Sequence, residues 1–269
     1  MREITLGQYY PVDSILHKLD PRVKFVGTLA YIAVLFIVKG VTGYIFAAAV
    51  LVFFASLSKV PAKIVARGIK PIWFILAITV AFNLFLTPGN TIFKWWIFTI
   101  TTEGVKTAVK MAIRLIFLVM GCSIMTLTTT PNELTDGMEK LFGPLKKIHF
   151  PVHEISMMMS IALRFIPILL EETDKIKKAQ IARGADFESG NFLKRVKAMI
   201  PILVPLFVSA FRRANDLAMA MEARCYHGGD ERTKMKPLIY AKRDYKAYAV
   251  LVLTLGLSVL FRIFGDNII

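Results

Sequence analysis

Two arginines in this chain close the same short pattern, Ala-x-x-Ala-Arg. The first pattern ends at Arg183 and is followed by Gly184, and the second ends at Arg224 and is followed by Cys225. A guanidinium group can grip a carboxylate through two parallel hydrogen bonds, which suits arginine to docking on an acidic partner. The repetition therefore predicts two equivalent basic contacts with two similar partners.

Each pattern ends a long amphipathic stretch that we expect to be a helix. The first stretch begins near Val152 and stops at Gly184, a residue type that tolerates the left-handed conformation closing many helices. Pro167 lies inside this stretch, so we expect a kink or a break near Phe165. Its apolar residues recur at spacings of three or four, which predicts one apolar face: Ile155, Met158, Met159, Ala162, Ile166 and Leu169.

The second stretch repeats this plan from about Phe192, with Pro201 and Pro205 early in it. A cysteine at positive φ has a steric cost that glycine avoids. We therefore expect this helix to continue past Cys225 and to end nearer Gly228-Gly229. Its predicted apolar face consists of Leu206, Ala210, Ala214, Leu217 and Met221.

The remainder of the chain has the composition of a polytopic membrane protein. Hydrophobic residues make up 55% of the sequence and the mean hydropathy is +0.56. Five apolar runs are candidate membrane spans: Val23–Val38, Tyr44–Leu57, Pro71–Leu86, about Val105–Leu127 and Ala247–Phe264. We therefore expect an all-α membrane protein with about five transmembrane helices.

Basic residues predict how these spans are oriented. Lysines and arginines gather before the first span and between the second and third spans, whereas the loops on the other side have only Lys39 and Lys94. By the positive-inside bias, the N-terminus is cytoplasmic. The predicted organisation is a membrane region with four spans (1–128), a cytoplasmic module that is too polar to cross the membrane (129–246), and a last span (247–269).

Two short motifs predict where helices begin. Thr130-Pro131-Asn132-Glu133 has the pattern of a capping box with proline at the first helical position, so a helix should start there and run to about Leu141. Asp20-Pro21 has the same function before the first span, with aspartate as the N-cap.

These features resemble the transmembrane T component of energy-coupling factor (ECF) transporters, which are vitamin and metal importers of the ABC class. The resemblance covers nearly the whole chain. It departs from the family pattern at Cys225, where a second glycine is expected. The motifs that carry it are Leu19-Asp20-Pro21-Arg22, Thr130-Pro131-Asn132-Glu133-Leu134, Ala182-Arg183-Gly184 and Ala223-Arg224-Cys225.

The resemblance implies a division of labour among subunits in the cell membrane. The two arginine motifs would dock into two cytoplasmic ABC ATPase subunits, which bind ATP and Mg, and the long kinked helices would be coupling helices. The spans would hold a separate substrate-binding S component, so this chain would need no cofactor and no nucleic acid. Met157-Met158-Met159 would suit contacts with exchangeable S components, although a plain methionine core is an equal alternative.

Other function classes have weaker support in the sequence. The chain has no phosphate-binding loop of the G-x-x-x-x-G-K-[ST] type, so it should not hydrolyse ATP itself. Pro151 separates His149 from His153 and disfavours a shared metal site. The alternatives are the permease of a self-contained ABC importer and a lipid or prenyl transferase. A transferase would use Glu171, Glu172 and Asp174, which a solvated helix face explains better.

One basic stripe remains open to two interpretations. Lys106, Lys110 and Arg114 recur every four residues along the predicted fourth span. The two lysines can snorkel to the outer headgroups. Arg114 lies deeper, where an ionisable residue is either a functional group or the partner of a structural pair inside the bundle.

The topology can be tested by cysteine labelling in a background without Cys122 and Cys225. A cysteine introduced at Asn90 should react with a membrane-impermeant maleimide on intact cells. A cysteine at Ser189 should react only after permeabilisation. The opposite labelling pattern would contradict the five-span topology and the cytoplasmic placement of the arginine motifs.

Overall fold

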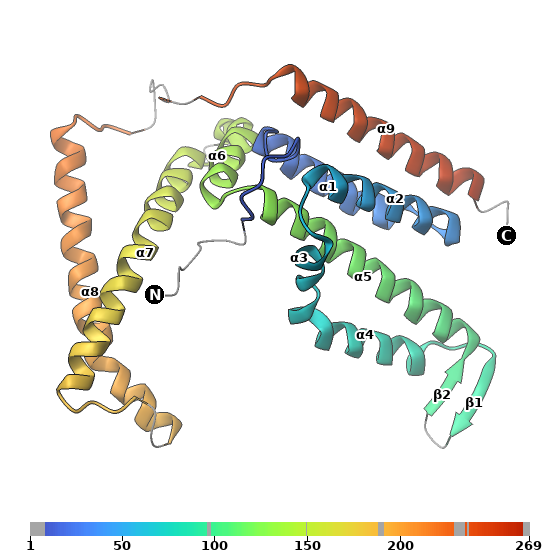
Figure 1. Cartoon of the computed structure of the whole chain (residues 1–269), viewed down its shortest axis with the longest axis horizontal. Coiled ribbons are helices and arrows are strands. Elements are labelled where there is room, and N and C mark those ends of the chain that lie inside the picture. The colour runs from blue at the N-terminus through green and yellow to red at the C-terminus, as the bar shows by residue number, and fades with distance from the viewer. Residues whose placement is uncertain are drawn as a thin grey trace. The chain divides into compact units, whose positions relative to one another are not determined.

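The computed structural model describes residues 9–95, 98–148, 150–187, 191–228, 235 and 237–265 (Figure 1). Its elements in chain order are α1 (Pro21–Ile37), α2 (Gly40–Ser58), α3 (Ala62–Arg67), η1 (Lys70–Ile72), α4 (Trp73–Leu86), β1 (Thr91–Trp95), β2 (Phe98–Thr101), α5 (Thr102–Thr128), α6 (Pro131–Phe142), η2 (Gly143–Ile148), α7 (Val152–Ala182), α8 (Phe192–Ala223) and α9 (Lys242–Gly265). The prediction of a helical membrane protein is confirmed. The short antiparallel hairpin of β1 and β2 was not predicted.

The chain divides into two compact units. The bundle unit comprises residues 7–137 and 238–269, and the α7–α8 unit comprises residues 138–237. The chain leaves the bundle unit within α6 and returns to it just before α9. The sequence analysis instead placed this return after Lys246, at the start of the last span.

Five helical segments in the described part of the chain are long and apolar enough to cross a membrane. Four of them, Gly40–Ser58, Ala62–Leu86, Thr102–Thr128 and Lys242–Ile263, agree with predicted spans. The fifth segment is α7. Its composition contradicts the expectation that the segment after Thr128 is too polar to cross a membrane. Charges are confined largely to the C-terminal half of α7, so its N-terminal half is apolar enough. The predicted first span corresponds to α1, which is not among these five segments. Its 17 residues cover only about 25 Å, less than the thickness of the hydrocarbon core of a bilayer.

Capping explains why several helices begin where the sequence predicts. Asp20 accepts a hydrogen bond from the Arg22 backbone N–H at 2.9 Å, and Pro21 is the first residue of α1. At α6, the Thr130 hydroxyl accepts from the Glu133 backbone N–H at 3.3 Å. The Glu133 carboxylate accepts in return from the Thr130 N–H at 3.2 Å. The predicted capping box is therefore confirmed.

The connection between α1 and α2 is shorter than predicted. Only Val38 and Lys39 separate the two helices, because α2 already begins at Gly40. Gly40 has a φ of 70°, a conformation that favours glycine. The predicted loop of five residues is thus mostly the first turn of α2.

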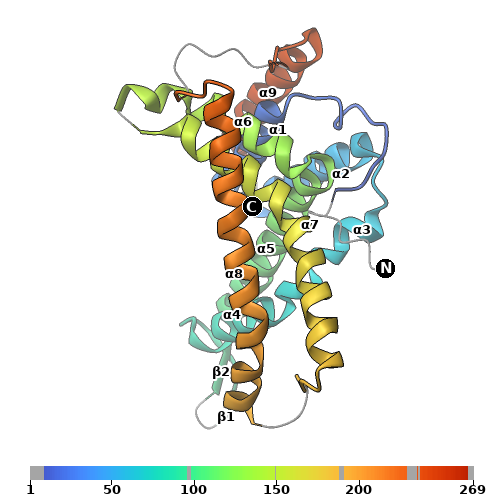
Figure 2. The ribbon, with the colours of Figure 1, turned by 90° about the vertical axis from the view of Figure 1, so that its left-hand side faces the viewer.

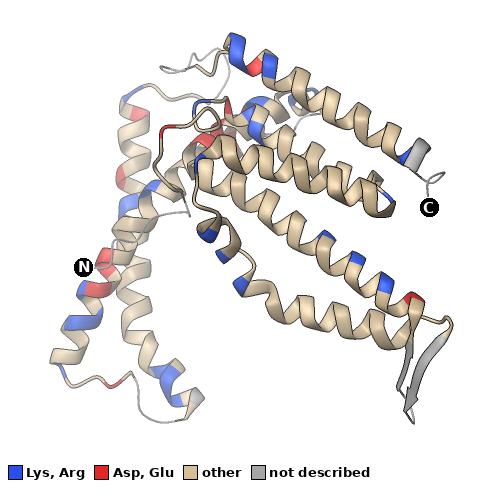
Figure 3. Cartoon of the chain, turned by 45° about the vertical axis from the view of Figure 1, so that its right-hand side comes forward, with Lys and Arg blue, Asp and Glu red and all other residues tan. Residues whose placement is uncertain are grey.

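The bundle unit is built by close packing of α1, α2, α5 and α9 (Figure 1). Leu35 and Ala47 are fully buried in its core, and Tyr31 is nearly so. Glycines allow the helices to approach: a Cβ atom on Gly121 of α5 would lie 2.6 Å from the Tyr31 ring of α1. Figure 3 shows few charged residues along the middle of these helices apart from the stripe on α5.

In the α7–α8 unit, both helices continue through their internal prolines. The helix α7 has no break at Pro167, so the break that was one of the two predicted outcomes near Phe165 is wrong. The helix α8 contains Pro201 and Pro205 and changes direction between its N-terminal and C-terminal parts (Figure 1). Pro205 cannot donate to the Pro201 carbonyl four residues before it. The Gln180 side chain donates to this carbonyl instead, at 3.4 Å.

The role of Gly121 can be tested against a matched glycine. Gly121→Ala should destabilise the bundle unit by about 1 to 3 kcal/mol because the new methyl group overlaps the Tyr31 ring. Gly256→Ala in α9 meets nothing within 4 Å, so it should not destabilise the protein and should gain about 0.5 to 1 kcal/mol from the higher helix propensity of alanine. The temperature at which the half-buried Cys122 thiol becomes reactive, measured in a Cys225→Ser background, reports the stability of both variants. Equal midpoints for the two variants would contradict this packing.

Candidate functional site

The two arginine patterns end their helices with the same backbone structure. Arg183 and Arg224 are the C-cap residues of α7 and α8, with φ and ψ of −90° and 8° in one and −95° and 16° in the other. The next residue is left-handed in both helices, with φ of 85° at Gly184 and 55° at Cys225. We call these the two arginine ends.

The same pair of hydrogen bonds closes each arginine end. The Gly184 N–H donates to the Ile181 carbonyl at 2.9 Å and the Ala185 N–H to the Gln180 carbonyl at 3.0 Å. In α8, two corresponding bonds of 2.8 and 3.0 Å run from Cys225 to Glu222 and from Tyr226 to Met221. Both ends are therefore Schellman motifs, which satisfy carbonyl groups that a helix end leaves without partners.

The backbone conformation of Cys225 shows that the predicted end of α8 is wrong. The helix α8 ends at Ala223 and does not continue toward Gly228, since Cys225 adopts the left-handed conformation that glycine occupies in α7. The steric cost of a side chain at positive φ is about 1 to 2 kcal/mol. Two hydrogen bonds and the exposed position of Cys225 offset this cost at α8.

Both guanidinium groups are free to meet a partner. Arg183 and Arg224 are exposed, and neither makes an ion pair within the residues that the structure describes. The flanking Ala182 and Ala223 are exposed as well. Small neighbours leave room for a groove to close around each arginine.

The two arginine ends lie at opposite ends of an antiparallel helix pair. Glu172 of α7 accepts hydrogen bonds from Ser209 at 2.6 Å and Arg213 at 3.0 Å, while Gln180 lies against Pro201. Residues later in α7 therefore pair with residues earlier in α8, and the two helices lie side by side in Figure 2. With 32 residues, α8 alone would be about 48 Å long if it were straight. One compact groove cannot hold both ends.

Glu172 has a structural role that the sequence did not predict. It was assigned with Glu171 and Asp174 to a solvated face, yet its side chain joins the two helices. Sequence motifs do not show this role, because Ser209 and Arg213 are far from Glu172 in the sequence. Helical spacing offers a weak signal, since Ser209 and Arg213 lie four residues apart on one face of α8.

The apolar faces of the pair agree only in part with the predicted faces. Ala210, Ala214, Leu217 and Met221 of α8 line a cavity of about 300 Å³ between the helices, as predicted for the α8 face. The cavity is lined from α7 by Ile161, Phe165 and Leu169, of which only Leu169 was predicted. Because α7 has apolar residues on more than one side, periodicity alone could not identify the side that meets α8.

Large apolar side chains on the remaining faces are exposed. Met158 and Met159 of α7 are 58% and 50% exposed, so they are not core residues of this chain. Met157 is half-buried. A second exposed apolar surface follows α8, and we call it the α8 apolar face: Ile200, Leu203, Val204, Phe207, Val208 and Phe211.

Of the other candidate residues, the described histidine is paired within the chain. His153 lies 3.1 Å from Glu139, which also accepts a hydrogen bond from Ser156. His149 lies outside the described residues. No group of three histidines, cysteines or carboxylates that could hold a metal ion occurs within the residues searched.

Arg114 has no ion-pair partner in the described part of the chain. Its guanidinium carbon lies 5.4 Å from the centre of the Phe36 ring, and its Nη1 lies 4.0 Å from the Met111 sulfur. Of the two interpretations of Arg114, the structural ion pair therefore has no support in the described residues.

Known proteins that resemble this chain match it over nearly its whole length. Residues 13–235 match the family model CbiQ, described as cobalt transport protein. A protein of Clostridium kluyveri named energy-coupling factor transporter transmembrane protein EcfT is 53% identical over 98% of both chains. The protein of the same name in Bacillus subtilis is 43% identical over 97% of this chain and 99% of its own length.

Substitutions at Gly184 and Cys225 should change the stability of the two arginine ends in opposite directions. Gly184→Ala should weaken the end of α7 by about 1 to 2 kcal/mol, because only the backbone conformation opposes the new methyl group. Cys225→Gly should strengthen the end of α8. Hydrogen exchange of the final amides measures both effects. Gly143→Ala also meets open space but without a positive φ, and it serves as the control. Unchanged exchange in both arginine ends would contradict the assigned strain.

Proposed function

Because this chain belongs to the family of energy-coupling factor transporter transmembrane proteins, we propose that its two arginine ends dock two ATPase subunits that drive import. The chain is the transmembrane energy-coupling component of such a transporter, and it is a transport subunit. ATP and Mg would be bound by the ATPases. The proposal concerns how this component transmits their movement.

One observation carries the proposal: the two arginine ends have the same backbone structure and are both exposed. Equal geometry suits two copies of one kind of groove, as two similar ATPase subunits would provide. Their separation along the helix pair favours one subunit at each end. An acidic groove would take each guanidinium in a bidentate ion pair.

The charges around α7 favour a position on the cytoplasmic side despite its apolar N-terminal half. Lysines precede α7 at Lys146 and Lys147, and Lys194, Arg195 and Lys197 follow it at the start of α8. A crossing helix would place one of these basic groups outside, against the positive-inside bias. We therefore propose that α7 and α8 together lie along the cytoplasmic face, with the N-terminus on the same side.

Exposed apolar surface supports a second partner within the membrane. Met158, Met159 and the α8 apolar face lie outside the packed interior of this chain. Exposed apolar patches rimmed by charges are typical of interaction surfaces. We assign this surface to a substrate-binding S component, with methionines that can adapt to different S components.

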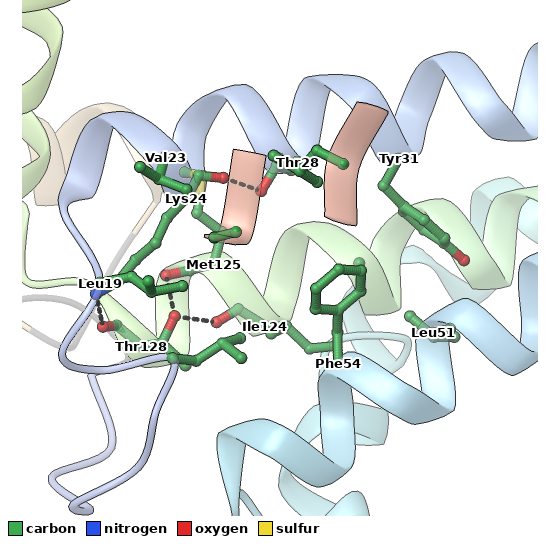
Figure 4. A pocket seen from close by; sticks show the side chains of 15 residues that line it. Leu19, Val23, Lys24, Thr28, Tyr31, Leu51, Phe54, Ile124, Met125 and Thr128 are labelled. Atoms are coloured by element: carbon green, nitrogen blue, oxygen red, sulfur yellow. Dashed lines mark hydrogen bonds between the residues drawn. The ribbon is translucent and has the colours of Figure 1, made fainter. Parts of the chain in front are cut away.

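The bundle unit provides little support for a self-contained permease. Its cavity between α1, α2, α5 and α9 measures about 80 Å³ and is mostly apolar (Figure 4). Binding pockets for small molecules usually measure about 300 Å³ or more. A vitamin or other micronutrient would therefore be held by the S component.

Loss of the arginines should separate the chain from its ATPases. Removing one member of a buried ion pair typically costs about 3 to 5 kcal/mol, so Arg183→Ala and Arg224→Ala should each reduce ATPase co-purification strongly, and the double variant should abolish it. Lysine should restore binding poorly because it lacks the bidentate fork.

Arg212→Ala is the matched control, since Arg212 is an exposed arginine of α8 away from the arginine ends. It should leave the complex intact. Normal recovery of ATPases with the double variant would show that the arginines are ordinary helix-end charges.

A further inference from the structure

The N-terminal half of α5 carries a row of three cations to which the proposed function assigns no role. Lys106, Lys110 and Arg114 are spaced four residues apart and therefore lie on one side of the helix, as Figure 3 shows. We call this row, which is about 12 Å long, the α5 basic stripe. Glu103 is the only acidic residue in the segment 21–128, and its carboxylate lies 3.8 Å from the Lys106 ammonium group. Both side chains of this pair are exposed, so the pair stabilises little and most of the charge of the stripe is not neutralised.

Arg114 is the member of the stripe that most needs an anion. Its Nε is buried and has no hydrogen-bond partner in the described part of the chain. The nearest acceptor to Nη1 is the Met111 sulfur at 4.0 Å, and a thioether is a weak acceptor. A cation that is removed from water without a strong acceptor is costly. An anion from outside the chain would supply the missing acceptor.

The membrane surface comes close to Arg114 because α1 is short. Arg114 lies 12 residues after the start of α5, about 18 Å along the helix, and its guanidinium carbon is 5.4 Å from the centre of the Phe36 ring. Phe36 is the penultimate residue of α1, so Arg114 lies beside the end of this helix. A helix of about 25 Å is shorter than the hydrocarbon core, and a bilayer adapts to such a helix by thinning locally. Lipid headgroups drawn to the end of α1 therefore reach the level of Arg114.

The direction of helical side chains brings the cations of the stripe toward the same headgroups. Side chains on a helix are tilted toward its N-terminus, which for α5 is the end at the membrane surface. The partial positive charge at this helix end also favours an anion. Lys39, which is exposed and follows Phe36 by three residues, adds a fourth cation near the end of α1. The local balance is thus four cations against the carboxylate of Glu103.

Exposed apolar side chains lie next to these cations. On α5, Val105 and Val109 directly precede Lys106 and Lys110 and are 37% and 52% exposed, and Phe36 of α1 is 61% exposed. A small soluble anion would gain nothing from such apolar neighbours, whereas a phospholipid offers both a phosphate and acyl chains. A zwitterionic headgroup would bring its own ammonium group to the cations. The combination therefore favours a headgroup with a net negative charge.

From these observations we propose that the α5 basic stripe and Lys39 bind the phosphate of an anionic phospholipid, whose acyl chains pack against the neighbouring apolar side chains. In the orientation predicted from the loop charges, this lipid belongs to the outer leaflet. The site lies entirely within the bundle unit. It goes beyond the proposed function and requires neither an ATPase nor an S component.

The test uses a tryptophan reporter beside the stripe in the full-length chain. Val109→Trp is introduced after the three native tryptophans, Trp73, Trp95 and Trp96, are changed to phenylalanine. The chain is reconstituted in phosphatidylcholine vesicles that contain increasing fractions of brominated phosphatidylglycerol or brominated phosphatidylcholine, which quench nearby tryptophan. Quenching at position 109 should show at least a tenfold preference for phosphatidylglycerol.

Substitutions in the stripe should change this preference in both directions. Lys110→Gln and Arg114→Gln should each lower it about fivefold, since a cation near anionic headgroups contributes about 1 kcal/mol, and together they should abolish it. Arg114→Lys keeps the charge and should retain most of the preference. Glu103→Gln should raise it, because the substitution removes the carboxylate that competes for Lys106.

Two controls separate this site from general attraction to anionic lipid. Lys63→Gln removes an exposed cation of α3 and should leave the preference at position 109 unchanged. A reporter at the exposed Leu253 of α9, Leu253→Trp, should be quenched equally by both lipids in every variant, which also shows that the variants remain folded.

Three results would overturn the proposal. Equal quenching by the two lipids at position 109 would leave the stripe to another anion, such as a carboxylate of a protein partner. An unchanged preference in the Lys110→Gln and Arg114→Gln double variant would show that the cations do not bind the lipid. Loss of the preference in inorganic phosphate, compared with chloride at the same ionic strength, would identify a site for a free anion.

Discussion

The need to satisfy backbone hydrogen bonds at helix ends is the constraint on which this structure depends. A protein that crosses a bilayer has no water in the hydrocarbon region to pair with free N–H and C=O groups. The helices α1, α5 and α6 begin with side-chain caps, from Asp20, Thr101 and Thr130. The helices α7 and α8 instead end in left-handed residues that close two backbone hydrogen bonds each. The same closure leaves an arginine exposed at the C-cap, so the structural solution also presents the group that we propose binds the ATPases.

Helix starts were predictable because their signals are local. Proline and capping side chains act within one turn, so α1 and α6 begin at the expected residues. The helices α7 and α8 also begin near the expected residues, although neither has a side-chain cap. The end of α8 was not predictable in this way, because propensity disfavours cysteine at positive φ while the closing hydrogen bonds favour it. The side of α7 that faces α8 and the role of Glu172 depend on contacts between distant residues. Asp20 and Lys24 likewise contact residues far away in sequence, Asp244 and Thr128, and only the N-cap role of Asp20 was predicted.

The distribution of charge divides the chain into two kinds of surface. The bundle helices are apolar along their middle sections, whereas α7 carries charges of both signs toward its C-terminal end (Figure 3). Apolar side chains on α7 and α8 nevertheless remain exposed. A unit with charged helix ends and apolar faces can contact a soluble partner at its ends and a membrane partner along its length. This combination suits the proposed binding of ATPase subunits at the arginine ends and of an S component along the apolar faces.

The central claim is that each arginine end meets its own ATPase subunit, and photo-crosslinking in cells tests it most directly. A photoreactive amino acid is placed at Ala182 or at Ala223, next to each exposed arginine, and at Val109 of α5 as a control. The account predicts ATP-binding subunits crosslinked from both Ala182 and Ala223, with two subunits captured when both positions carry the crosslinker, and none from Val109. Failure of both positions to capture an ATPase, or capture of one subunit by both ends, would contradict it.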